Sequence, residues 1–223
     1  MKLVLYSGGQ QRSNQELHQE LMNLTGKRRN ISLTYVPFCA DNAEIFFRRI
    51  SKRFQRFGAS RFQCLPLDLP HAPTPDEIKR AFSSDVVYLA GGNTFYFLHW
   101  IKKRKLLGTL RNYVKDGGVL AGLSAGAHMM TPHIGLAGLK GLDPDENEIG
   151  LKSLSALGLV DFEFMPHFYE SRHSLRVMRN YSEKSRTTIY ACADGGGIVI
   201  HGHLFSVLGR SWVFHDGDWL KLT

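Results

Sequence analysis

The chain has 223 residues, of which 43% are hydrophobic and 22% are charged, with a formal net charge of +8. This composition is ordinary for a globular protein with one sizeable core, so we expect a single domain over residues 1–223. The sequence has no apolar run long enough for a signal peptide or a membrane span. Its three isolated cysteines exclude a disulfide framework. These two observations together predict a cytoplasmic protein.

The first part of the chain alternates apolar runs with amphipathic stretches, in the rhythm of a parallel α/β sheet. The apolar run from Val86 to Ala90 suits a strand that is buried on both faces. We expect strands at Lys2 to Tyr6, Ile31 to Pro37, Arg61 to Leu65, Val86 to Ala90 and Val119 to Gly122. We expect helices near Asn14 to Leu24, Asn42 to Phe57, Pro75 to Phe82, Phe95 to Lys103 and Leu106 to Lys115.

The rhythm changes after Ala127. A polar, acid-rich segment at residues 143–148 precedes a strand at Phe162 to Met165 and a helix from about Ser171 to Glu183. From Thr188 to Leu222 the sequence predicts short antiparallel strands separated by glycine turns. In a doubly wound sheet the ligand crevice lies outside the carboxyl ends of the strands, so we expect the site where glycine turns follow Ala90 and Gly122.

A serine between two glycines follows the fifth expected strand, in the sequence Gly122-Leu123-Ser124-Ala125-Gly126. This is the sequence form of a nucleophile elbow, in which a sharp strand-to-helix turn strains the serine backbone and leaves no room for neighbouring side chains. Ser124 would stand at the strand tip, beside the free N–H groups of a helix N-terminus.

A serine hydroxyl needs a base to remove its proton and an acid to orient that base. Of the ten histidines, His167 is the best placed, because it ends an apolar strand. The acid is not decided by spacing alone. Candidates lie in the loop before that strand, at Asp143, Asp145, Glu146 and Glu148, and at strand ends, at Asp161 and Asp194.

A second glycine turn, Gly91-Gly92-Asn93-Thr94, follows the fourth expected strand. Its simplest interpretation is a tight turn in which Asn93 or Thr94 caps the next helix. The backbone N–H groups of such glycines can also approach a reacting carbonyl closely and complete an oxyanion hole with the N–H of Ala125. Both interpretations can hold together.

The basic clusters fall where helix ends or helix surfaces are expected, so we interpret them as solvated faces and expect neither a nucleic acid nor a membrane as partner. They lie at residues 27–29, 52–56 and 102–105.

Three blocks, at residues 91–95, 122–127 and 166–168, together resemble the peptidase E family of serine peptidases, the α-aspartyl dipeptidases related to cyanophycinases. This family shares its fold with class I glutamine amidotransferases. The resemblance implies a flavodoxin-like three-layer α/β sandwich with a mainly parallel central sheet and a C-terminal antiparallel extension.

The resemblance also implies a mechanism and a set of site residues. Ser124 would be the nucleophile and His167 the base, and the N–H groups of Gly92 and Ala125 would form the oxyanion hole. Asp143 occupies the position most similar to the family's acid, with Asp145 and Asp194 as alternatives. Arg172 would recognise an acidic residue at the substrate's N-terminus, and Asn93 would contact substrate.

The sequence thus predicts a dipeptidase that needs no metal or organic cofactor, takes small peptides as substrates and is compatible with a homodimer. Cyanophycinase-like or esterase-type hydrolysis and a non-catalytic basic binding module on the same fold are the alternatives. A glutamine amidotransferase would need a cysteine where Ser124 stands.

Overall fold

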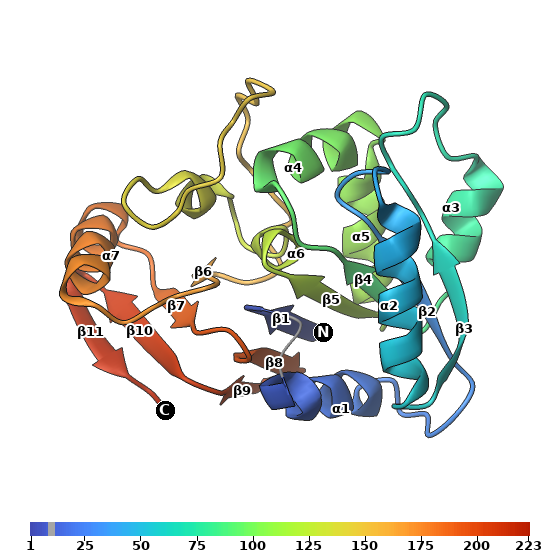
Figure 1. Cartoon of the computed structure of the whole chain (residues 1–223), viewed down its shortest axis with the longest axis horizontal. Coiled ribbons are helices and arrows are strands. Elements are labelled where there is room, and N and C mark those ends of the chain that lie inside the picture. Colours follow the sequence, from blue (N-terminus) through green and yellow to red (C-terminus); the bar gives the residue numbers. More distant parts are fainter. Residues whose placement is uncertain (9–11) are drawn as a thin grey trace.

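The computed structural model describes residues 1–8 and 12–223, and its largest element is a seven-stranded sheet (Figure 1). The strand order is β3-β2-β4-β5-β1-β8-β9. The first five of these strands run parallel, and β8 and β9 are antiparallel to their neighbours. The strands are β1 (Lys2–Tyr6), β2 (Ile31–Val36), β3 (Ala59–Cys64), β4 (Val86–Leu89), β5 (Val119–Leu123), β8 (Gly197–His201) and β9 (Leu204–Leu208).

Helices cover both faces of this sheet, because successive residues of its central strands point to opposite sides. Leu3 and Leu5 of β1 pack into one core and Val4 and Tyr6 into the other. One face carries α1 (Gln15–Asn23) and α2 (Ala43–Gln55), and the other carries α3 (Pro75–Ala81), α4 (Thr94–Lys103), α5 (Leu106–Lys115) and α6 (Ala125–His128). The expected three-layer α/β class is confirmed.

A second, four-stranded sheet has the order β11-β10-β7-β6 and packs against α7 (Arg172–Ser185), at the left of Figure 1. Its strands are β6 (Glu163–Met165), β7 (Ile189–Cys192), β10 (Ser211–His215) and β11 (Asp218–Lys221). Met178 of α7, Trp212 and Phe214 fill the core between them. The expected antiparallel extension is therefore divided: β8 and β9 extend the main sheet, whereas β7 pairs in parallel with β6 and joins the second sheet.

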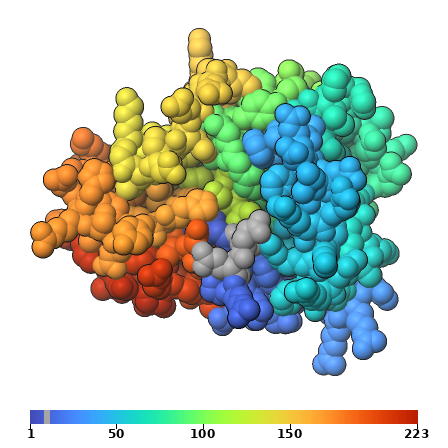
Figure 2. Space-filling view, viewed as in Figure 1, coloured from blue at the N-terminus to red at the C-terminus, as the bar shows by residue number. Residues whose placement is uncertain are grey.

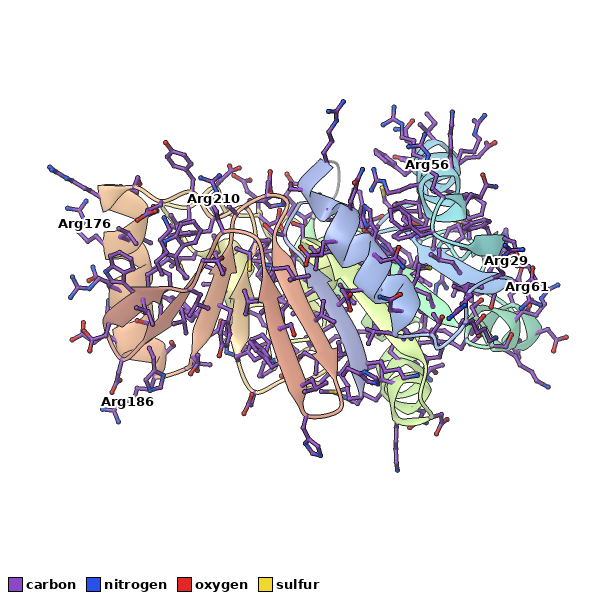
Figure 3. The ribbon with its side chains drawn as sticks, turned by 90° about the horizontal axis from the view of Figure 1, so that it is seen from below. Arg29, Arg56, Arg61, Arg176, Arg186 and Arg210 are labelled. Carbon is purple, nitrogen blue, oxygen red and sulfur yellow. The ribbon has the colours of Figure 1, made fainter. Side chains whose placement is uncertain are left out.

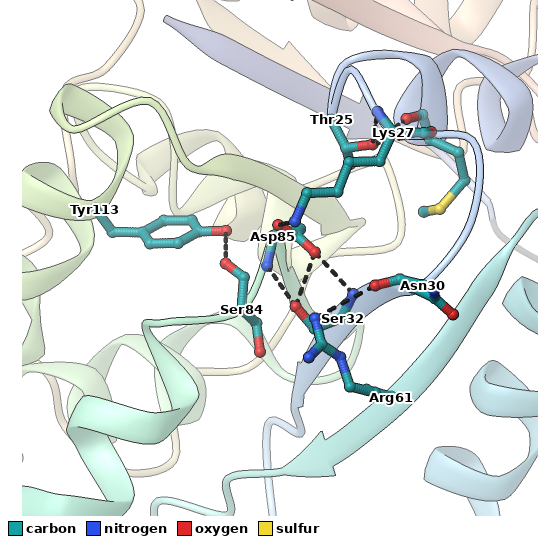
Figure 4. A network of polar contacts seen from close by, with 9 residues as sticks. Thr25, Lys27, Asn30, Ser32, Arg61, Ser84, Asp85 and Tyr113 are labelled. Atoms are coloured by element: carbon teal, nitrogen blue, oxygen red, sulfur yellow. Dashed lines mark hydrogen bonds and ion pairs between the residues drawn. The ribbon is translucent and has the colours of Figure 1, made fainter.

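A polar network joins the amino ends of β2 and β4 (Figure 4). Ser124, in contrast, follows the carboxyl end of β5, so the network lies at the opposite end of the parallel strands. Asp85 accepts hydrogen bonds from the Lys27 ammonium at 2.6 Å and from the Ser32 N–H and hydroxyl at 2.9 Å. Partial burial alone would raise the pKa of Asp85, but the hydrogen bonds from Lys27 and Ser32 together outweigh it and lower that pKa.

The basic surplus is spread over the molecule. Arg29, Arg56 and Arg61 lie at one end of the view in Figure 3, whereas Arg176 and Arg186 lie at the other. No helix within residues 1–8 and 12–223 is long and apolar enough to cross a membrane.

Candidate active site

Ser124 lies between the end of β5 and the start of α6, in a backbone conformation that serine rarely adopts, with φ 50° and ψ −106°. Its N–H donates to the Tyr6 carbonyl at 2.9 Å, which ties the elbow to the neighbouring strand β1. A Cβ at Gly122 would lie 2.2 Å from the Gly126 carbonyl oxygen, and one at Gly126 would lie 2.4 Å from the Leu89 carbonyl oxygen. Both glycines are therefore required by close backbone packing, as the sequence predicts.

His167 follows β6 and also has a left-handed backbone, with φ 56°. Its N–H donates to the Ser7 hydroxyl at 2.7 Å, and that hydroxyl donates to the Cys192 carbonyl at 2.8 Å. Ser7 directly follows β1 and is fully buried. The residue that follows β1 thus holds together the ends of β6 and β7, which belong to the other sheet.

These elements bring three side chains into one hydrogen-bonded chain. His167 Nε2 lies 2.9 Å from Ser124 Oγ, and His167 Nδ1 lies 2.6 Å from Asp194 Oδ1. A carboxylate can only accept, so Nδ1 carries the proton, and Nε2 of the neutral ring accepts from the serine hydroxyl. The His167 and Asp194 side chains are 52% and 45% exposed, so solvent reaches the base and the acid.

The carboxylate beside His167 is that of Asp194, which corrects the expectation that Asp143 would lie there. Because β6 and β7 are parallel neighbours, the residues that follow them meet at the same edge of the second sheet. Asp143 is instead exposed in the segment before β6, with a left-handed backbone conformation at φ 51°. Asp145 accepts a hydrogen bond from the Thr94 N–H at 2.8 Å and so caps α4.

Gly8 makes room for this acid. A Cβ built at Gly8 would lie 2.3 Å from Asp194 Oδ1 and 2.6 Å from its Cγ. Neither Ser7 nor Gly8 was singled out from the sequence. Their signal was a polar and a small residue directly after the apolar run of β1, at the carboxyl end of a central strand.

The second glycine turn lies beside the elbow. Gly92 has φ 142°, a conformation that favours glycine, and Gly91 packs against Leu123, since a Cβ there would lie 3.4 Å from the Leu123 carbonyl oxygen. Ala125 is the first residue of α6, so its N–H has no acceptor within the helix. The two backbone groups expected to bind an oxyanion therefore come from turns that lie next to each other.

Asn93 acts as the helix cap that the sequence offered as the simplest interpretation. Its side-chain oxygen accepts from the Tyr96 N–H at 2.9 Å, and its amide donates to the Glu146 carbonyl at 2.9 Å. These contacts occupy both ends of the side chain, so they do not support the expected contact of Asn93 with substrate. They attach the acid-rich loop to the glycine turn.

His128 of α6 is buried close to His167. Its burial, and secondarily the proximity of His167, lower the pKa of His128 to about 3. The ring is therefore neutral at neutral pH and adds no second positive charge beside His167. Within the described part of the chain, no group of three or more His, Cys, Asp or Glu side chains could hold a metal ion.

Arg172 is exposed in the first turn of α7 and lines a groove of about 540 Å³ with the turn between β10 and β11. The residues that line this groove do not include Ser124, His167 or Asp194. The yellow-green elbow region, in contrast, is visible at the centre of the face in Figure 2, between α2 and the orange segment that precedes α7.

A hydroxyl, an imidazole and a carboxylate in this order form the constellation that serine hydrolases use on several unrelated folds. The family model of peptidase family S51 matches residues 3–208. The chain therefore belongs to peptidase family S51.

Individual relatives agree with this assignment. "Uncharacterized peptidase YgaJ" from Bacillus subtilis (strain 168) is 29% identical over 93% of this chain and 87% of its own length. "Peptidase E" from Salmonella arizonae is 34% identical over 60% of this chain and 61% of its own length. The crystal structure of a peptidase from an acI-B1 Actinobacterium shares the fold, with a TM-score of 0.76 at 16% identity, over 100% of this chain and 93% of the other. The resemblance to the peptidase E family is thus confirmed.

Proposed function

We propose that this protein hydrolyses short peptides through an acyl-enzyme formed on Ser124. The observation that carries the proposal is the continuous chain Ser124–His167–Asp194, with contacts of 2.9 and 2.6 Å. The S51 family assignment supports peptide bonds, rather than other acyl compounds, as the substrate class.

The geometry suits the two halves of acyl transfer. His167 Nε2 takes the hydroxyl proton as Ser124 Oγ attacks the scissile carbonyl, then gives that proton to the leaving amine as the C–N bond breaks. Water repeats the sequence: His167 takes its proton, the hydroxide oxygen bonds to the acyl carbon, and the Ser124 oxygen leaves and is protonated. Asp194 holds Nδ1–H and stabilises the imidazolium that forms in each half.

The negative charge on the carbonyl oxygen would be stabilised by the N–H groups of Gly92 and Ala125. A backbone donor of this kind contributes about 3 kcal/mol to the transition state. Gly92 packs against the Phe38 ring, and Ala125 begins α6 directly after the closely packed elbow, which supports two donors that are already in place when the charge develops.

The test is hydrolysis of a dipeptide panel by the wild type, Ser124→Ala and His167→Ala, together with labelling of Ser124 by a fluorophosphonate. We expect turnover and labelling in the wild type, and loss of both in Ser124→Ala. Equal turnover by the wild type and Ser124→Ala would end the serine mechanism. Turnover of p-nitrophenyl esters without any turnover of peptides would favour an esterase.

A preference for an acidic N-terminal residue, recognised by Arg172, stays a prediction. Because Arg172 is exposed, its charge would contribute modestly, and we expect Arg172→Ala to reduce the Asp-X over Ala-X preference by about two- to fivefold. Arg186→Ala, just beyond the other end of α7, is the matched control. An unchanged preference in Arg172→Ala would remove this role.

A further inference from the structure

A cavity of about 270 Å³, here named the α2 pocket, adjoins the two glycine turns of the candidate site. Gly91, Gly92 and Leu123 line it on the side of the elbow, and Leu123 directly precedes Ser124. The opposite wall comes from α2, which lies beside β2 and β4 in Figure 1. Its volume is close to the lower end of the range for ligand pockets, about 300–1,000 Å³.

The walls of the α2 pocket combine apolar and charged side chains. The rings of Tyr35, Phe38 and Phe46 and the side chain of Ile50 form its apolar part, and Asp41, Arg49 and Arg53 also line it. Phe38 packs directly against the glycine turn, since a Cβ at Gly92 would lie 2.1 Å from Phe38 Cδ1. A group bound against Phe38 would therefore lie next to the backbone that we assign to the oxyanion hole.

One polar group of this lining lacks a partner. The Tyr88 side chain is fully buried and lines the α2 pocket, and its hydroxyl has no hydrogen-bond partner among the described residues. The neighbouring Tyr6, in contrast, donates its hydroxyl to the Leu17 carbonyl at 3.0 Å. Burial raises the pKa of Tyr88, so its hydroxyl stays protonated and is available as a donor.

A buried donor without an acceptor is unfavourable, and a ligand that supplies the acceptor gains from satisfying it. The α2 pocket therefore offers aromatic and aliphatic side chains, three charged side chains and the unsatisfied Tyr88 hydroxyl, beside the backbone turn where a scissile carbonyl would be bound. This combination matches a side chain that is apolar along its length and ends in an acceptor oxygen.

We propose that the α2 pocket binds the side chain of a substrate residue flanking the scissile bond, and that it prefers an aromatic side chain ending in an oxygen, as in tyrosine. The inference rests on the proposed peptidase function and adds the substrate class. It is independent of Arg172, which lines a different groove.

The experiment measures kcat/KM on dipeptides in which each of the two positions is Ala, Phe or Tyr in turn. We expect the wild type to prefer Tyr over Phe, and Phe over Ala, at one position. Tyr88→Phe removes only the hydroxyl and should lower the Tyr over Phe ratio by about three- to tenfold. Tyr190→Phe on β7, outside the α2 pocket, is the matched control and should leave this ratio unchanged.

A second variant tests the space itself. Cys39 lines the pocket, so the larger side chain of Cys39→Trp should narrow the cavity. Because Cys39 is partly exposed, we expect the fold to tolerate this side chain. We expect the preference for Phe over Ala to fall by at least about tenfold in this variant.

The unfolding temperature of Tyr88→Phe tests whether the hydroxyl has a partner. If this temperature is no lower than that of the wild type, the hydroxyl is unpartnered in the free protein.

The outcomes separate the two proposals. Peptide turnover with the same Tyr, Phe and Ala ratios in all variants would overturn the α2 pocket as a subsite and leave the peptidase function standing. A lower unfolding temperature for Tyr88→Phe would show that the hydroxyl already has a partner and would overturn the preference for an acceptor oxygen. A wild type that neither cleaves any peptide nor labels at Ser124 would overturn the proposed function and, with it, this inference.

Discussion

Replacing Asp194 with asparagine tests the candidate site most directly, because it keeps the shape of the side chain and removes its charge. The Nδ1–Oδ1 distance is 2.6 Å, so transfer of the serine proton to His167 creates an ion pair at that separation. At this distance a unit pair gains about 1.6 kcal/mol in water and about 6 kcal/mol at an effective dielectric constant of 20.

The two side chains are about half exposed, at 52% and 45%, so the true gain lies between these limits. An amide can also present its NH₂ to Nδ1, which would move the ring proton to Nε2 and leave no acceptor for the serine hydroxyl. We expect Asp194→Asn to reduce kcat by about 10² to 10³, with little change in KM.

The matched control is Asp143→Asn, which changes the carboxylate that family resemblance favoured and the structure leaves exposed. The assay is steady-state hydrolysis of the best dipeptide of the panel, with circular dichroism to show that both variants fold. A full loss in Asp143→Asn, combined with normal activity in Asp194→Asn, would refute the reasoning from the contact between His167 and Asp194.

The remaining predictions concern backbone packing and the Asp85 network. Gly8→Ala places a Cβ 2.3 Å from Asp194 Oδ1, so we expect a large loss of kcat with little change in the unfolding temperature, and normal activity would contradict the role assigned to Gly8. Gly126→Ala should destabilise the fold by about 1–3 kcal/mol in urea unfolding, because its Cβ would overlap the backbone of β4. Gly108→Ala, in α5 with open space around it, should stabilise the fold by about 0.5–1 kcal/mol. For Asp85 the folded-state pKa is lowered, so its contribution is complete above the unfolded pKa of about 4 and disappears as the pH falls through the folded value. Asp85→Asn should therefore lower the unfolding free energy by about 1–2 kcal/mol at pH 7, and a difference that persists unchanged to the lowest pH would contradict this account.

Most helices and strands were predictable because their signals are local. The expected bounds of β1 and α5 coincide with those in the structure, and the two-glycine pattern around Ser124 correctly indicated the close packing at Gly122 and Gly126. His167 was predictable as a polar residue at a strand end.

The acid was not predictable, because its place depends on which strands become neighbours. Several carboxylates lie in the loop before β6 and at the ends of later strands. Their spacing from His167 along the chain does not distinguish one from another. Only the parallel pairing of β6 with β7 put Asp194 beside His167, and only the end of β1 gave it room through Gly8.

The sequence by itself therefore determined the fold class, the strained serine and the glycine turn beside it, since side-chain periodicity and the lack of a Cβ act within a few residues. The tertiary structure decided the partner of the imidazole and the lining of the α2 pocket. Both depend on contacts between segments far apart in the chain, as between Ser7 and Cys192 or Phe38 and Gly92, and no local pattern specifies such contacts.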